Sequence, residues 1–288
     1  MAILTGIFSR LYGSVGSVTF SQTGGKTVVK QKVGKKSVPV RTWRQMRRRV
    51  LWANLVNLYR AFSGRLHPSF ENKEAGCSDY NEFMSVNIGG SGVALTAEEA
   101  RQGGCVVSSY QVTRGTLPSV GVTFAENNVP VTDIAVGGLA LGASTTLKTF
   151  SKAILDNNSS WKNGDQLSVF IARQTVDSTT GVPRVKIEAV EITLDKNNET
   201  ALLGDLVDID MFTVADGFLS LAGSVNGGVA VVQSRLTLEG TEVSTQFFVV
   251  SNPLLVQYQS EAAVEAAVMS YGGVAQEEFL TPNVDAMA

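Results

Sequence analysis

A series of short β-rich runs constrains the fold of this chain more than any other feature of its sequence. From Cys105 onward, β-branched and aromatic residues occur in runs that Gly, Asn and Pro residues separate. This spacing is typical of an antiparallel β-sandwich, in which each short strand turns back to pair with a neighbour. The predicted strands are residues 106–112, 120–124, 167–173, 185–194, 207–214, 218–222, 229–238 and 245–250.

The region before these runs predicts a hairpin and a long helix. Alternating residues on both sides of Gly24-Gly25 favour a β-hairpin. Thr42 and Gln45 have the spacing of a capping box, which predicts a helix start at that point. The residues Leu51, Leu55, Leu58 and Phe62 then recur at helical spacing and form one apolar face, which Trp52, Val56 and Tyr59 widen. Gly64 is placed to end the helix.

Shorter helices are predicted at four further places. They are expected at residues 79–84, after the capping box of Thr96 and Glu99, at residues 145–155, and at residues 260–269 with Ser260 as the cap. The fold class expected is therefore α+β: an N-terminal basic β-hairpin and long helix, then a mainly antiparallel β-sandwich body with a few short helices. We divide the chain into a basic hairpin and helical region, residues 1–104, and a β-rich sandwich domain, residues 105–288. This second part includes two inserted helices and an extended C-terminal tail.

The distribution of charge separates the two ends of the chain. The formal net charge is only −2, but the first 70 residues hold 13 of the 24 basic residues and none of the 26 acidic ones. They therefore carry +13, and the remaining 218 residues carry −15. Such asymmetry indicates a basic arm whose partner is polyanionic or acidic.

The start of the predicted helix concentrates this charge. Three adjacent arginines point in directions about 100° apart on a helix, so not all of them can lie against a core. A helix N-terminus already favours anions, and arginines there are unfavourable unless something negative is supplied. Nucleic acid and an acidic protein surface, including another copy of this chain, both remain open as partners. The candidate partner-binding residues are Lys26, Lys30, Lys32, Lys35, Lys36, Arg41, Arg44, Arg47, Arg48 and Arg49.

Residues that usually perform catalysis are scarce. The chain has one histidine, His67, which precedes a proline and is interpreted as a turn residue. Cys77 and Cys105 match no metal-ligand spacing and are interpreted as small apolar residues rather than as a bridge. The acids Asp205, Asp208 and Asp210 lack the pattern of a calcium loop and fit a solvated turn or strand. We expect no enzyme activity, no cofactor, no metal site and no small-molecule substrate.

Membrane and export signals are also absent from the sequence. No apolar run reaches the roughly 20 residues that a membrane helix needs. The N-terminus lacks the basic start and apolar stretch of a secretory signal, so synthesis in the cytoplasm is expected.

Several features of the N-terminal region form a recognisable pattern. They are G-x-x-G-x-V-x-F from Gly13, the segment 24–29, Thr42-x-x-Gln45-x-x-x-Arg49, the segment 54–59 and Phe70. Three C-terminal segments add to the pattern: 234–235, 243–246 and Ala267-x-x-Ser270-Tyr271-Gly272. Together these features resemble a family of uncharacterised proteins found in Bacteroidota genomes and in their bacteriophages. Where family members often carry Asn-Pro-Arg-Thr, this chain has Pro39-Val40-Arg41-Thr42. The middle of the chain is not covered by this resemblance.

The resemblance implies a setting rather than an activity. In a bacterium of this kind or its phage, a non-enzymatic β-sandwich protein with a basic arm fits a virion component. We therefore expect a structural virion protein, made in the host cytoplasm, that associates with the capsid or portal and contacts other copies of itself and other virion proteins. The alternative is a nucleic-acid-binding accessory protein that uses residues 26–49, with Trp43 stacking on a base.

Overall fold

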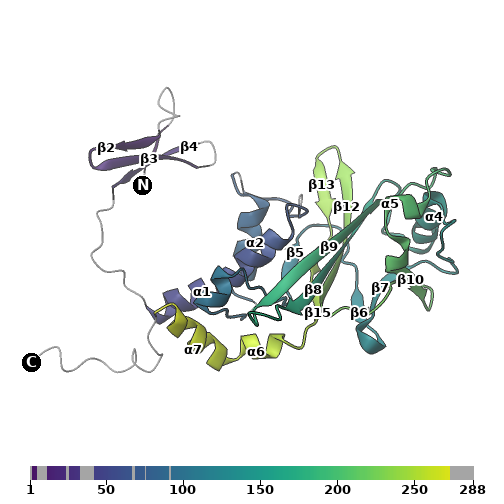
Figure 1. Ribbon diagram of the computed structural model, residues 1–288. Coiled ribbons are helices and arrows are strands. Elements are labelled where there is room, and N and C mark those ends of the chain that lie inside the picture. Colours follow the sequence, from purple (N-terminus) through teal and green to yellow (C-terminus); the bar gives the residue numbers. More distant parts are fainter. Residues whose placement is uncertain are drawn as a thin grey trace, which may run out of the picture.

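A computed structural model describes residues 2–4, 12–23, 26–32, 42–66, 69–74, 76–90 and 92–272. Its helices and antiparallel sheets confirm the α+β class, with strands at the N-terminus followed by a long helix (Figure 1). His67, Lys35, Lys36, Arg41, the Gly24-Gly25 pair and the tail beyond residue 272 lie outside the described residues.

The N-terminal strands form one antiparallel sheet in the order β1-β4-β3-β2. The predicted hairpin is confirmed by β3 and β4, in which Thr23 lies opposite Lys26. Two residues therefore connect the strands, which is the loop length of the tightest hairpins. The sheet consists of β1 (Ala2–Leu4), β2 (Gly13–Val15), β3 (Val18–Thr23) and β4 (Lys26–Gln31).

Three helices follow, and side-chain caps start each one. Helix α1 (Trp43–Ala61) begins where predicted, because Thr42 Oγ1 accepts a hydrogen bond from Gln45 N at 3.4 Å. Helix α2 (Asp79–Asn87) is capped by Ser78. Helix α3 (Ala97–Arg101) has the complete capping box, in which Glu99 Oε2 accepts from Thr96 N at 2.8 Å.

The predicted apolar face of α1 is largely confirmed. Leu55, Leu58 and Phe62 are fully or almost fully buried, and Leu51 is half-buried. Trp52 is 43% exposed, so its predicted place on this face is wrong. It lies one position after Leu51 and is therefore rotated by about 100° away from that face.

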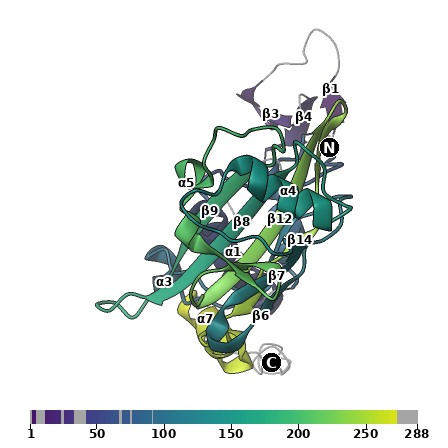
Figure 2. The ribbon, with the colours of Figure 1, turned by 90° about the vertical axis from the view of Figure 1, so that its right-hand side faces the viewer.

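Two larger sheets and one two-stranded sheet make up the β-rich part of the chain. The central sheet has the order β13-β12-β8-β9, with β15 pairing to β12, and the second has the order β10-β11-β7-β6. Figure 2 shows β9, β8 and β12 running side by side. The central strands are β8 (Gln166–Val176), β9 (Pro183–Thr193), β12 (Gly227–Thr237), β13 (Gly240–Val243) and β15 (Val249–Ser251). The second sheet has β6 (Val122–Phe124), β7 (Pro130–Ala135), β10 (Phe212–Ala215) and β11 (Phe218–Leu221), and β5 (Gln111–Thr113) pairs with β14 (Gln246–Phe247).

The central sheet is covered on both faces. Val169 and Ile171 of β8 pack into a core with the second sheet and helix α4 (Leu147–Asn157). The alternate residue Phe170 packs into a different core with helices α1 and α2. Successive side chains of a strand point to opposite faces, so one continuous apolar run supplies both cores. The order of layers is helices, central sheet and second sheet.

The remaining helices are short. They are α5 (Leu203–Leu206), α6 (Leu255–Gln259) and α7 (Glu261–Ser270). Ser260 caps α7 as predicted, and its Oγ accepts from Ala263 N at 3.1 Å. Cys77 and Cys105 are free, and burial raises the pKa of the Cys105 thiol far above its usual range.

Three predicted strands are partly wrong. The segment expected at 245–250 is divided between β14, which pairs with β5, and β15, which pairs with β12. The segment expected at 106–112 is irregular until β5 begins at Gln111. The segment expected at 207–214 first makes a 3₁₀ turn, Ile209–Met211, which Asp208 caps, and only then enters β10.

Strands β1, β7 and β13 and helices α5 and α6 were not predicted. All of them except β7 have five residues or fewer, which is too short for an apolar period to be recognised. Strand β7 begins with Pro130 and contains Asp133, and both residue types are depleted in strands.

Candidate basic interaction surface

The first turns of α1 carry three arginines on one face. Arg44, Arg47 and Arg48 are spaced at i, i+3 and i+4, and Leu51 continues the row at i+7. Residues at these spacings are neighbours along one side of a helix. Met46 and Val50 lie between them in sequence but are buried against helix α7. The packing of Met46 and Val50 therefore fixes the direction in which the arginines point.

These side chains line a surface hollow of about 610 Å³, which we call the arginine hollow. Arg44, Arg47 and Arg48 are exposed, whereas Leu51 and Ile88 are half-buried. The second wall comes from the end of α2, so the hollow joins segments about forty residues apart in the sequence. Its lining residues are Arg44, Gln45, Arg47, Arg48, Leu51, Ile88 and Gly89.

No acidic residue lines the arginine hollow in the described part of the chain. No described Asp or Glu forms an ion pair with Arg44, Arg47 or Arg48. The first turn of α1 contains no acidic residue either. Because the N-terminal end of a helix is itself partly positive, these three charges add to an unfavourable local field. An external anion would relieve it.

Arg49 lies on another side of α1 and has a different environment. Its guanidinium carbon is 5.5 Å from the ring centroid of Tyr271, which follows helix α7. That distance is within the range of a cation–π contact. Burial raises the pKa of Tyr271, and the nearby Arg49 charge acts in the opposite direction. The prediction that the adjacent arginines diverge is thus fulfilled, and Arg49 does not line the arginine hollow.

The three predicted lysines that the structure describes lie in the N-terminal sheet or directly after it. Lys26 is the first residue of β4. Lys30 and Lys32 are exposed, one within β4 and the other one residue after its end. Among the described residues, these lysines and the arginine hollow are separate surfaces of the chain. Trp43, proposed as a base-stacking residue, packs against the core beside α7.

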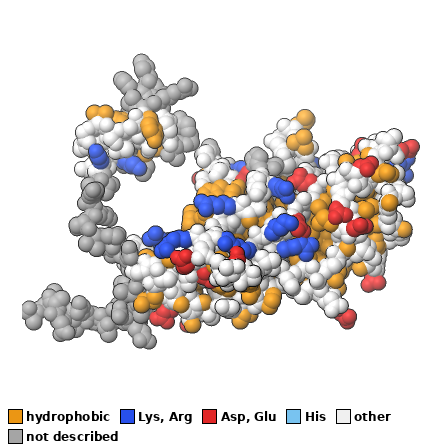
Figure 3. Space-filling view, viewed as in Figure 1, with side chains coloured by type: hydrophobic (Ala, Val, Ile, Leu, Met, Phe, Trp, Pro, Cys, Tyr) orange, Lys and Arg blue, Asp and Glu red, His pale blue; other side chains and the backbone are white. Residues whose placement is uncertain are grey.

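An acidic hollow lies next to the β12–β13 hairpin, and the sequence analysis did not identify it. Glu71, Glu239 and Glu242 line this hollow of about 460 Å³. In Figure 3, Lys and Arg side chains gather over α1 and α2, and Asp and Glu are more frequent towards the end with α4 and β10. The only sequence signal for this hollow was the net charge of −15 after residue 70, which does not say where the acids meet.

The described residues contain neither a metal-binding cluster nor a membrane-spanning helix. Within that part of the chain, no group of three or more His, Cys, Asp or Glu side chains could hold a metal ion. None of its helices combines the length and apolar character needed to cross a bilayer. No family model matches the chain, and neither curated proteins nor solved structures give a significant match.

Proposed function

We propose that this protein is a non-enzymatic structural protein of a bacteriophage virion, a capsid- or portal-associated assembly component that oligomerises through its basic N-terminal arm. By basic N-terminal arm we mean residues 26–49. The arm of one copy contacts an acidic surface on another copy or on another virion protein. The virion setting is supported by the resemblance of the N-terminal sequence to the Bacteroidota and phage family.

The observation that carries the proposal is the row of Arg44, Arg47 and Arg48. These side chains are exposed on one face of α1, and no described carboxylate pairs with them. The same chain carries an acidic hollow elsewhere on its surface. Opposite charges on separate patches of one protein favour association between copies and guide their orientation.

Charge reversal at α1 tests the assembly part of the proposal. Arg47→Glu/Arg48→Glu should weaken self-association by about tenfold or more, because it places acids opposite acids. The matched control is Lys162→Glu/Lys196→Glu, which changes the charge equally at two exposed lysines outside α1. Sedimentation velocity over a concentration series measures the self-association of both variants. Equal effects of the two variants, or a wild-type chain that stays monomeric, would overturn this part.

The virion part needs a separate measurement. Purified phage particles that encode this chain should contain it at a constant copy number per particle, measured by quantitative mass spectrometry. The particles must first be washed in high salt, because salt screens the exposed charges of loosely adhering proteins. Loss of the chain in that wash would contradict a place in the virion.

A nucleic-acid-binding accessory protein is the second candidate, and the same exposed arginines favour it. Each phosphate that a Lys or Arg neutralises releases counterions, so affinity should fall steeply with salt. Binding of a DNA duplex measured by fluorescence anisotropy at several salt concentrations gives that slope. A slope that flattens in Arg47→Glu/Arg48→Glu would support this candidate, whereas an unchanged slope would exclude α1 as the DNA-binding site.

A further inference from the structure

The tip of the β12–β13 hairpin exposes two leucines to solvent. Leu236 is 82% exposed and Leu238 is fully exposed. Figure 1 shows the hairpin rising beyond its neighbours, and apolar side chains cap this projection in Figure 3. Exposed apolar side chains grouped on a projection mark an interaction surface more often than scattered ones do. We call Leu236, Leu238 and Glu239 the hairpin tip.

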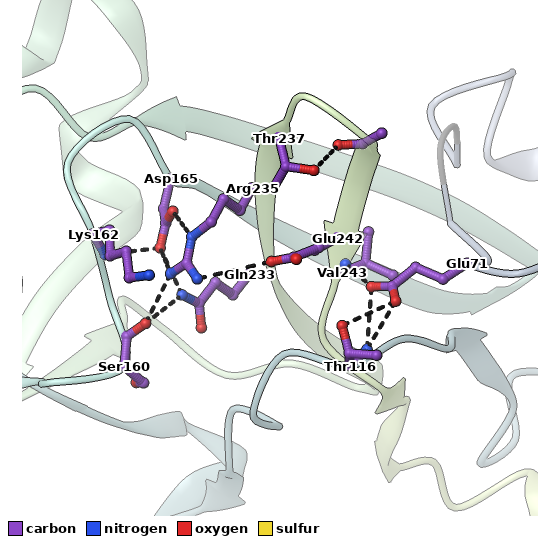
Figure 4. Close-up of polar contacts among 11 residues, drawn as sticks. Glu71, Thr116, Ser160, Lys162, Asp165, Gln233, Arg235, Thr237, Glu242 and Val243 are labelled. Carbon is purple, nitrogen blue, oxygen red and sulfur yellow. Dashed lines mark hydrogen bonds and ion pairs between the residues drawn. The ribbon is translucent and has the colours of Figure 1, made fainter.

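The base of the hairpin is held on two sides (Figure 4). On one side, Arg235 of β12 makes a paired contact with the buried Asp165, with Nε–Oδ1 and Nη2–Oδ2 distances of 2.7 Å. On the other side, the Glu71 carboxylate accepts hydrogen bonds from Val243 N of β13 and from Thr116. A projection held in this way loses little conformational entropy when it binds, so more of its contact energy is retained as affinity.

The chemistry of the hairpin tip matches the arginine hollow. The hairpin combines its two exposed leucines with the exposed acid Glu239 and with Glu242, whose carboxylate lies 3.9 Å from Arg235 Nη1. The arginine hollow has Leu51 and Ile88 as its apolar part and three arginines around them. One surface projects and is acidic, while the other is recessed and basic, so both shape and charge are complementary.

We propose that the hairpin tip of one copy docks into the arginine hollow of a second copy. This inference rests on the proposed function and names the two surfaces of its self-association. Leu236 and Leu238 lie against Leu51 and Ile88, and Glu239 lies among the arginines. The two surfaces differ, so each copy inserts its hairpin tip into one neighbour and accepts a hairpin tip in its own arginine hollow. Such contacts close into a ring, or into a dimer in which each copy docks into the other.

Removal of the leucines is the first test. Leu236→Ser/Leu238→Ser should weaken self-association by at least tenfold in sedimentation velocity, because each buried leucine contributes on the order of one decade or more of affinity. The control is Val256→Ser, which removes an apolar side chain that is 79% exposed on α6. Both variants change exposed positions, and their unfolding curves should match that of the wild type.

The second test exchanges charges between the two surfaces. Glu239→Arg and Arg47→Glu/Arg48→Glu should each weaken self-association, and the combined variant should regain part of the lost affinity. Losses that simply add would overturn the docking model. If the wild type assembles but the leucine variant assembles equally well, the inference fails while the proposed function stands. If the wild type stays monomeric at the highest concentration reached, the proposed self-association itself fails.

Discussion

The side-chain amide of Asn54 pairs with the backbone of Val106 as a neighbouring strand would. Asn54 Nδ2 donates to Val106 O at 2.9 Å, and Asn54 Oδ1 accepts from Val106 N at 2.8 Å. Asn54 is fully buried in α1 and also donates to the hydroxyl of Tyr110. One side chain thus fixes α1 to the segment that precedes β5. It also satisfies backbone groups that would otherwise need a strand partner.

Replacement of Asn54 should lower the stability of the fold. Asn54→Leu leaves the N–H and C=O of Val106 buried without partners, so the free energy of unfolding should fall by about 3 kcal/mol. Urea denaturation measures the change. The control Asn81→Leu alters an exposed asparagine of α2 and should have little effect. Similar losses in both variants would show that the Asn54–Val106 contact is not the cause.

The ion pair at the hairpin base predicts a second loss of stability. Asp165 is almost fully buried, and Arg235 is only 16% exposed. Asp165→Asn leaves that guanidinium with only the more distant and more exposed carboxylate of Glu242, at 3.9 Å, which should cost about 3 kcal/mol of unfolding free energy. Thermal unfolding checks this value. The double variant Asp165→Asn/Arg235→Met should be more stable than Asp165→Asn alone, and a further loss instead would contradict the argument.

Glu188 should make stability depend on pH in the acidic range. A hydrogen bond from Arg173, at 2.9 Å, holds the pKa of Glu188 below its usual value, while burial acts in the opposite direction. The stabilisation is therefore present above the ordinary glutamate pKa of about 4.3 and is lost as the pH falls through the lower folded-state value. Glu188→Gln should cost about 0.5 kcal/mol near neutral pH, because the pair is partly exposed.

The difference between wild type and Glu188→Gln should shrink as the pH is lowered below about 4. Unfolding free energies measured across that range provide the comparison. Arg173→Gln should reduce the same pH dependence, because its hydrogen bond is the main cause of the shift. Parallel stability curves for wild type and Glu188→Gln would contradict the assignment.

Gly227 at the start of β12 should tolerate no side chain. Its φ is +141°, and a Cβ there would collide with the carbonyl oxygen of Ala172 on β8. Gly227→Ala should therefore reduce the free energy of unfolding by about 3 kcal/mol. The control Gly138→Ala has open space around its Cβ and an ordinary φ, and it should be nearly neutral. Denaturant titration distinguishes the two, and a stable Gly227→Ala variant would refute the steric argument.

The features predicted best are those that depend on neighbours in the sequence. Thr42 and Ser260 start their helices because each cap needs only a backbone N–H three residues ahead. The exposed arginines follow from the helix period in the same way, since Met46 and Val50 occupy the packed side of α1. In contrast, Ile88 and Gly89 complete the arginine hollow only because α2 packs beside α1. No local pattern indicates that contact.

The α+β class, the helix starts and the separation of basic and acidic residues can be predicted from the amino-acid sequence, because these features depend on composition, short spacings and local hydrogen bonds. Which apolar residues are buried depends instead on how the layers pack. In β12, Val231 is fully buried and Leu236 is exposed, although the two belong to one β-rich run. Burial depends on the layers that cover a strand. The second sheet and the helices cover the first part of β12 and leave its end uncovered, which is why the hairpin tip is a surface that sequence patterns did not reveal.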